Sequence, residues 1–244
     1  MKLNYFTLSL ILILGFTSCS DSEDSTPDPV TSANIIGSVN LYDEGTSQID
    51  NSGMTVKLED TSFSATTDVQ GDFTLTNVPF GTYTIIYEKA GFGTYKKFDL
   101  KHSNTSSSTI ITETPSIGQM SSTEITNIAV TSNTSNIIIS ATTNPAGSNG
   151  NTRYVRYFLS ENADVSNENY NFYSQGLISQ INPYDINLSQ DDLISAGFTT
   201  GQTIHIKVYG DSFWSNEYNN PNLQIKVFPN LNMTSTSSVS FVVP

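Results

Sequence analysis

Short segments in which apolar residues occupy every second position recur along this chain from about residue 34 onward. Met54, Val56 and Leu58 form one such run, and Tyr83 and Ile85 belong to another. Alternation with a period of two is typical of β-strands that bury one face. Turn-rich pieces separate the runs, and so many short strands do not make one flat sheet with a stable single-sided core. A two-layer β-sandwich is therefore predicted.

Composition supports an all-β chain and narrows the classes of partner. Serine, threonine and asparagine make up 88 of the 244 residues, a mixture that suits strands and turns better than helices. The net charge of −13 repels phosphate backbones, so no nucleic-acid partner is expected. One cysteine and two histidines leave no zinc cage and no internal disulfide, and we expect no cofactor.

We predict two β-sandwich domains in tandem. The first, residues 34–115, holds about seven short strands. Residues 116–122 form a polar stretch that opens the second domain, residues 116–244. Because no helix in the second domain is long enough to cross over between parallel strands, its strands are expected to be antiparallel. They are expected at Ile125–Val130, Ile137–Ala141, Val155–Leu159, Ile204–Val208, Leu223–Phe228 and Val239–Val243.

The second domain also contains a helix signal. Ser189, followed by Asp191 and Asp192 and later by Gly197, predicts one short capped helix in a connection. The segment Arg153–Ser160 resembles bacterial adhesion-type immunoglobulin-like domains, so an immunoglobulin- or fibronectin-like sandwich is expected for this domain.

Residues Thr67–Ile85 carry the most specific pattern of the first domain. Asp68 can accept hydrogen bonds within its own turn, and Gly71 permits the positive φ that such a turn requires. With Gly37–Val39 upstream and Lys89–Phe92 downstream, this stretch resembles the carboxypeptidase regulatory-like domain, a transthyretin-like β-sandwich. The motif residues of that family are structural, so the resemblance supplies no catalytic residue.

The N-terminal segment has the features of an export signal. Residues 1–18 carry one early positive charge and the apolar run Leu8–Phe16, which is too short to span a bilayer as a helix. The sequence Phe16–Cys19 resembles the lipobox of bacterial lipoproteins. That resemblance implies cleavage before Cys19, lipid attachment to its thiol and anchoring by several acyl chains. The alternative is a plain secretory peptide followed by an unmodified cysteine.

An acidic tether, residues 19–33, begins at this cysteine. Its first part, Ser20–Asp24, resembles the short export signal that sends lipoproteins of Bacteroidota to the outer face of the outer membrane. A solvated acidic linker without a targeting role is the alternative. We therefore expect an outer membrane lipoprotein that faces the cell exterior.

A search for catalytic or metal-binding motifs finds none. His102 and His205 lie in or beside predicted strands and are expected to face solvent. Glu161, Asp164 and Glu168 could gather around calcium, but they lack the alternating ligand spacing of a calcium loop. Without a paired acid and base or a nucleophile motif, we expect that the protein is not an enzyme.

One segment, Tyr209–Pro221, has the composition of a ligand site. It contains the only tryptophan and alternates aromatic rings with amide and carboxylate groups. Sugars are bound by such mixtures, because rings cover C–H faces and amides pair with hydroxyls. The alternative is that Phe213 or Trp214 plugs one end of the sandwich. The candidate ligand-binding residues are Tyr209, Phe213, Trp214, Asn216, Tyr218, Asn219 and Asn220.

These observations lead to one functional expectation and one alternative. The expectation is a non-enzymatic cell-envelope lipoprotein that acts as a surface binding or scaffold module, with glycans as candidate ligands. Its expected partners are the outer membrane, through the lipid on Cys19, and a glycan or an envelope protein. The alternative is an adhesin-type module that binds proteins through exposed strand edges, or a structural spacer of an envelope complex.

Overall fold

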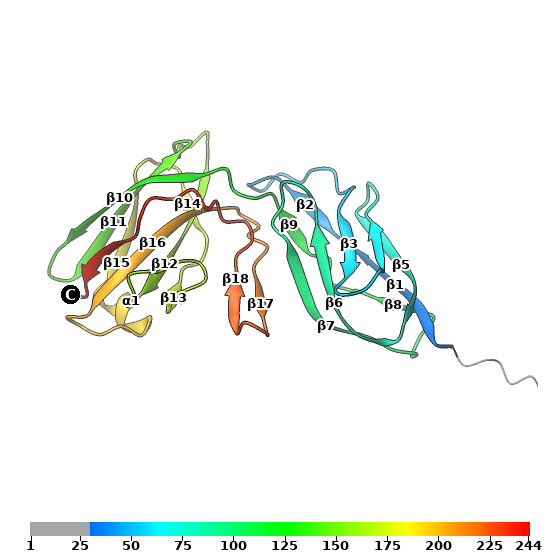
Figure 1. Cartoon of the computed structure of the whole chain (residues 1–244). Coiled ribbons are helices and arrows are strands. Elements are labelled where there is room, and N and C mark those ends of the chain that lie inside the picture. Colours follow the sequence, from blue (N-terminus) through cyan, green and yellow to red (C-terminus); the bar gives the residue numbers. More distant parts are fainter. Residues whose placement is uncertain (1–29) are drawn as a thin grey trace, which may run out of the picture. The chain divides into compact units, whose positions relative to one another are not determined.

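The structure is a computed structural model that describes residues 30–244. It is nearly all β, and its strands form two β-sandwiches in tandem, which confirms the predicted fold class (Figure 1). The predicted signal peptide and Cys19 lie outside the described residues, as does most of the predicted tether. Within residues 30–244, no helix has the length and apolar character needed to cross a membrane.

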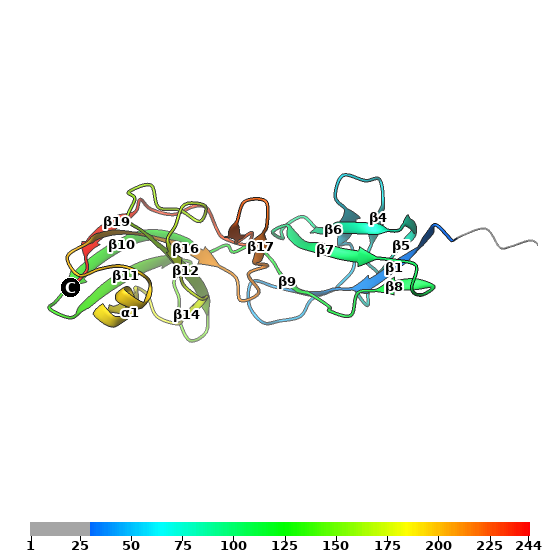
Figure 2. The same ribbon diagram turned by 90° about the horizontal axis from the view of Figure 1, so that it is seen from below.

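In the part of the chain that the structure describes, the first sandwich contains nine strands. They are β1 (Ser32–Ser38), β2 (Asn40–Tyr42), β3 (Thr55–Leu58), β4 (Ser64–Thr66), β5 (Asp72–Pro79), β6 (Gly81–Glu88), β7 (Tyr95–His102), β8 (Ser108–Ile110) and β9 (Ser116–Gly118). One sheet has the strand order β5-β1-β8 and the other β4-β3-β6-β7, while β2 pairs with β9 in parallel. Figure 2 shows β6 and β7 in one layer and β1 and β8 in the other. Because β9 pairs with β2, the first sandwich continues to residue 118, past the predicted boundary at 115.

The turn between β4 and β5 forms as its residue types require. The Asp68 carboxylate accepts backbone N–H bonds from Gln70 and Asp72, each 2.9 Å long. Gly71 has φ +88°, and a Cβ at this position would lie 2.1 Å from the carbonyl oxygen of Val39. Only glycine fits this approach of the turn to β1 and β2, so the turn predicted from Asp68 and Gly71 is confirmed.

The core of the first sandwich includes a histidine that we expected at the surface. His102 is 2% exposed, its Nε2 is 2.9 Å from the carbonyl oxygen of Val78, and its Nδ1 is 2.7 Å from the hydroxyl of Thr109. The prediction that His102 faces solvent is wrong, because both ring nitrogens have partners on neighbouring segments and the ring can be buried without loss of hydrogen bonds. The apolar core of this sandwich includes Ile35, Leu41, Met54, Val56, Leu58, Phe73, Leu75, Ile85 and Tyr87.

The second sandwich contains ten strands and one helix. They are β10 (Glu124–Ser132), β11 (Asn136–Asn144), β12 (Arg153–Ser160), β13 (Phe172–Tyr173), β14 (Leu177–Ser179), β15 (Tyr184–Ser189), α1 (Gln190–Ser195), β16 (Thr203–Asp211), β17 (Tyr218–Asn220), β18 (Ile225–Val227) and β19 (Val239–Val242). One sheet has the order β10-β11-β15, and the other has the order β13-β12-β16-β19 with β14 also on β12. All these pairs are antiparallel, as predicted. The hairpin β17–β18 stands apart from both sheets.

The helix α1 confirms the capping signal read from the sequence. The Ser189 hydroxyl accepts the backbone N–H of Asp192, and the Asp192 carboxylate accepts the backbone N–H of Ser189. Leu193 is buried under the helix, and Gly197 follows it at φ +98°. This reciprocal pair is a capping box, which satisfies two otherwise free N–H groups at the start of a helix.

Strand β12 is covered on both faces, which its sequence did not indicate. Every residue of Arg153–Ser160 is buried. Val155 belongs to the main core of the second sandwich, whereas Phe158 belongs to a separate cluster with Tyr209 on the opposite face. Since residues two apart share a face of a strand, Arg156 points to the same side as Phe158. A charged side chain is thereby enclosed beneath the segment that follows β16.

The close approach at Gly71 leads to a stability prediction. Gly71→Ala should lower the free energy of unfolding by about 2–4 kcal/mol, because the new methyl group meets the Val39 carbonyl at a positive φ. Gly91→Ala is the matched control, since Gly91 has a similar φ of +84° with no atom within 4 Å of the added Cβ. It should lose only about 1 kcal/mol. Urea unfolding of both variants checks this, and equal losses would contradict it.

Candidate functional site

The predicted ligand segment forms a joint between the two sandwiches. Asn216, at φ +55°, is 6% exposed and its side chain is fully engaged. Its Oδ1 accepts the N–H of Gly118 at 2.8 Å, and its Nδ2 donates to the Gly118 carbonyl at 3.0 Å and to the Asn230 Oδ1 at 2.9 Å. A primary amide has two donors and one acceptor oxygen, so Asn216 has no free group for a ligand.

A second buried amide completes this joint. Asn230 is fully buried, and its Oδ1 also accepts the N–H of Gly93 at 3.0 Å. Its Nδ2 donates to the carbonyls of Gly118 at 2.9 Å and Trp214 at 2.7 Å. A Cβ on Gly93 would lie 2.4 Å from the Pro229 carbonyl oxygen, and one on Gly118 would lie 2.5 Å from that of Trp214. The two glycines allow the sandwiches to approach closely enough for these bonds.

Trp214 lies in the same joint and packs on the first sandwich. Its ring centroid is 4.9 Å from that of Tyr42 and 5.2 Å from that of Phe213. The indole Nε1 is buried, and no hydrogen-bond partner for it occurs within residues 30–244. The ring therefore bridges two domains, an arrangement that neither the sugar-platform interpretation nor the end-plug alternative anticipated.

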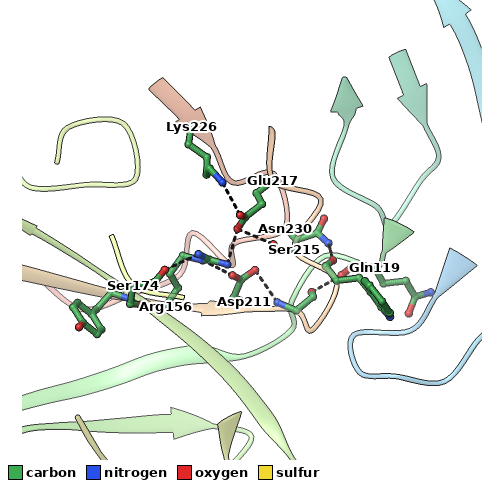
Figure 3. A network of polar contacts seen from close by, with 11 residues as sticks. Gln119, Arg156, Ser174, Asp211, Ser215, Glu217, Lys226 and Asn230 are labelled. Atoms are coloured by element: carbon green, nitrogen blue, oxygen red, sulfur yellow. Dashed lines mark hydrogen bonds and ion pairs between the residues drawn. The ribbon is translucent and has the colours of Figure 1, made fainter. Parts of the chain in front are cut away.

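An ion cluster lies beside the joint (Figure 3). The Arg156 Nε is 2.7 Å from the Asp211 carboxylate and its Nη2 is 3.0 Å from the Glu217 carboxylate. The Lys226 Nζ is 2.8 Å from the other oxygen of Glu217. Arg156 also donates to the carbonyl of Ser174 at 2.7 Å. Figure 3 shows the guanidinium between the two carboxylates, with Lys226 reaching Glu217 from β18.

The two carboxylates of the cluster have different environments. Burial raises the pKa of Asp211, against the opposing effect of the Arg156 guanidinium. Burial acts in the same direction on Glu217, but the hydrogen bond from Lys226 and the charges of Arg156 and Lys226 outweigh it, so the pKa of Glu217 falls below its ordinary value. Asp211 is sealed from solvent, whereas Glu217 is about one-third exposed. Of these two carboxylates, only that of Glu217 is accessible to a ligand.

Glu217 faces a cleft of about 750 Å³, which we name the Arg156 cleft. Its apolar lining is the rings of Phe172, Tyr173 and Phe213. Its polar lining includes Arg156, Asn171, Gln175, Glu217 and Lys226. Phe213 is 43% exposed, and its ring also contacts Tyr154 at a centroid distance of 5.7 Å. One exposed ring, Phe213, and two half-buried rings beside donors and acceptors make this cleft the strongest candidate for a ligand site.

The other predicted site residues lie in different parts of the structure. Tyr209 is buried in the cluster around Phe158, so it is not available to a ligand. Tyr218 packs against Tyr95 and Phe98 of β7, at centroid distances of 6.2 and 6.0 Å. Asn219 and Asn220 line a second cleft of about 660 Å³ at the hairpin β17–β18, which we name the hairpin cleft.

For two of the seven predicted site residues, the structure therefore corrects the predicted ligand-binding role. Tyr209 and Asn216 are core and joint residues, because burial and hydrogen bonding inside the protein occupy them. Sequence reasoning also missed Arg156 and Tyr173, which come from segments distant from the predicted loop, and Lys226, which lies in the strand after it. The one available signal was Arg156, a charged residue flanked on both sides by apolar and aromatic residues, Tyr154–Val155 and Tyr157–Phe158.

No metal site is found in the described residues. Within residues 30–244, no three His, Cys, Asp or Glu side chains are grouped so that they could hold an ion. Glu161, Asp164 and Glu168, the residues that could have gathered around calcium, do not form such a group.

Comparison with known proteins identifies the first sandwich. Residues 35–123 match the family described as CarboxypepD_reg-like domain. This match covers about a third of the chain and confirms the family resemblance predicted from the turn at Asp68 and Gly71. No curated protein matches the chain.

Several solved structures show weaker similarity. One chain from an interface mutant of a type II cohesin–X-dockerin complex of Acetivibrio cellulolyticus is 21% identical, with a TM-score of 0.30, and the match covers 36% of this chain and 58% of that one. In a second interface mutant of the same complex, the match covers 51% of the other chain. A “putative carbohydrate binding protein” from Bacteroides uniformis is 13% identical over 87% of this chain and 99% of that one, with a TM-score of 0.32. A DUF3823 family protein from Bacteroides ovatus is 11% identical over 87% and 100%, with a TM-score of 0.32.

The joint predicts that Asn216 contributes strongly to the stability of the fold, whereas the nearby Asn219 contributes little. Asn216→Ala should lower the free energy of unfolding by about 2–4 kcal/mol, because it leaves the Gly118 N–H and the Asn230 amide without buried partners. Asn219→Ala, three residues away and exposed, should change it by less than about 0.5 kcal/mol. Urea unfolding measures both values, and similar effects for the two variants would refute the role given to Asn216.

The ion cluster predicts a pH dependence. Since the folded-state pKa of Glu217 lies below its ordinary value of 4.5, its pairing stabilises the fold fully above that pH and the effect is lost as pH falls. Glu217→Gln should therefore lower the melting temperature at pH 7 and have a smaller effect at pH 3. Glu168→Gln, at an exposed position, is the control. A Glu217→Gln effect that is equal at both pH values would contradict the assignment.

Proposed function

We propose that this protein is a non-catalytic binding module of the cell envelope and that it binds carbohydrate in the Arg156 cleft. The observation that carries this proposal is the lining of that cleft, where the rings of Phe172, Tyr173 and Phe213 lie beside charged and amide groups. Its volume of about 750 Å³ lies within the range of small-molecule sites, about 300–1,000 Å³.

The chemistry of the lining suits a sugar. An exposed ring such as Phe213 can cover the apolar C–H face of a pyranose. Lys226, whose side chain is 24% exposed, supplies donors, and the Glu217 carboxylate beside it accepts, so a pair of adjacent hydroxyls can donate to one group and accept from the other. The Arg156 side chain is only 4% exposed and holds Glu217 in place. The cluster is held by its own ion pairs before any ligand arrives, which limits the entropy lost on binding.

The same geometry supports binding without catalysis. Glycoside hydrolysis needs two carboxyl groups on either side of the scissile bond, one of them a general acid with a raised pKa. Among residues 30–244, Glu217 is the one carboxylate that lines the Arg156 cleft, and its pKa is lowered. Asp211 has a raised pKa but is fully buried behind Arg156, so it cannot reach a substrate in this cleft.

Envelope anchoring is the second part of the proposal. It rests on the lipobox-like sequence Phe16–Cys19 and the acidic stretch Ser20–Asp24. A lipid on Cys19 would hold the sandwiches at the outer membrane, facing the exterior, where polysaccharides and envelope proteins are available. Labelled palmitate incorporation into the wild type and Cys19→Ala separates a lipid anchor from a plain secretory signal.

The cleft predicts a change in binding without a change in folding. Phe213→Ala should weaken binding about tenfold, or about 1.4 kcal/mol, because an exposed ring contributes to the ligand contact. Its melting temperature should remain close to that of the wild type. Isothermal titration with a panel of maltose, cellobiose, xylobiose and mannobiose and their hexamers provides the measurement.

A control and a contrary result are available for this experiment. Ile178→Ala removes a side chain that is 53% exposed and lies outside both clefts, so it should leave binding unchanged. If no member of the panel binds, or if Phe213→Ala binds as well as the wild type, the carbohydrate function is wrong. The rigid joint around Asn216 then favours the spacer alternative.

A further inference from the structure

The hairpin cleft shares two lining residues with the Arg156 cleft. Tyr173 and Lys226 line both, so the two cavities meet at these side chains. The Lys226 Nζ lies 5.6 Å from the centroid of the Tyr173 ring. The second cavity, of about 660 Å³, therefore lies directly across Tyr173 and Lys226 from the first.

The wall between the two clefts is fixed by Tyr170. Its hydroxyl accepts the backbone N–H of Lys226 and donates to the Lys226 carbonyl, both at 3.1 Å. The Tyr170 ring contacts Tyr173 edge-on, with 5.5 Å between the centroids. These bonds hold β18 against the second sandwich, so the hairpin cleft has a built wall that does not depend on a ligand.

Two residues with unusual backbone conformations line the hairpin cleft. Asp99 has φ +58° and Gln224 has φ +56°, in the left-handed region that side chains other than glycine adopt rarely. Asp99 lies in a β-bulge, where Phe98 and Asp99 of β7 face the single residue Thr84 of β6. Bulges and such outliers gather at functional sites, where they aim side chains into a cavity.

The polar groups of this cleft are free to meet hydroxyls. Across residues 30–244, no side-chain hydrogen bond joins Asp99, Asn219 or Gln224 to another residue. The ring of Phe98 lies beside them in the lining. A carboxylate, two amides and an aromatic ring repeat the composition of the Arg156 cleft.

We propose that the hairpin cleft is a second sugar subsite and that the two clefts together bind a neutral oligosaccharide chain. This inference rests on the proposed function of the Arg156 cleft and names its ligand class. Across the joined clefts, Arg156 and Lys226 are balanced by Glu217 and Asp99, so the lining has no net charge. The chain as a whole carries −13, which repels acidic polysaccharides.

Gln224→Gly provides the test in the full chain. Glycine accepts the positive φ at this position without strain, so the variant removes the side chain and should keep or raise the melting temperature. For whichever neutral series binds in a Phe213-dependent manner, the wild type should bind the hexasaccharide at least tenfold more tightly than the disaccharide. Gln224→Gly should weaken hexasaccharide binding about fivefold and leave disaccharide binding unchanged.

The controls separate this inference from the proposed function. Leu223→Ala changes the same turn but lines a different cavity on the hairpin, so it should have no effect. Equal affinity for disaccharide and hexasaccharide, or no effect of Gln224→Gly on the hexasaccharide, overturns the second subsite while the Arg156 cleft stands. Tighter binding of hexagalacturonate than of the neutral hexamer overturns the ligand class. Binding of no sugar at all removes both proposals.

Discussion

The amide pair Asn216–Asn230 is the contact on which the arrangement of the functional face depends. Both side chains are buried, and together they take up the backbone groups of Gly93 and Gly118 in the first sandwich. Buried polar groups stabilise a structure only when every one is satisfied, so this network admits one arrangement of the segment after β16. That arrangement leaves Phe213 exposed on one side and directs Glu217 toward Arg156 on the other. The same segment supplies Phe213, Ser215 and Glu217 to the lining of the Arg156 cleft.

The Arg156 cluster has a different physical role. Removing two charges from water costs more than an ion pair commonly returns, so a buried pair such as Arg156–Asp211 is weak evidence for stability. The ion pair instead fixes the orientation of the Arg156 guanidinium. Asp211 holds one edge of the guanidinium, Ser174 takes another nitrogen, and the remaining edge is left facing Glu217 and the cleft. Because β12 is covered on both faces, this cation cannot relax into solvent.

Local patterns predicted the elements, and long-range contacts decided the site. Alternation located most long strands, and Asp68 with Gly71 and Ser189 with Asp192 specified a turn and a cap, because each signal is complete within a few residues. The joint joins Asn216 to Gly118 across 98 positions, a pairing that no local pattern contains. The burial of His102 was missed for the same reason, because its hydrogen-bond partners Val78 and Thr109 lie on other strands. Loop composition suggested one sugar site, but Asn216 is bonded within the protein, and Asn219 lines a different cleft from Phe213.

Trp214 is the single tryptophan of the chain, and it lies in the joint between the sandwiches. Its fluorescence therefore reports on one place in the molecule. If the sandwiches separate, the indole leaves Tyr42 for water and its emission moves to longer wavelength, while the circular dichroism of the strands is unchanged. If they unfold together, both signals change in the same transition. The chain thus carries a built-in optical reporter of whether its two domains melt as one unit or as two.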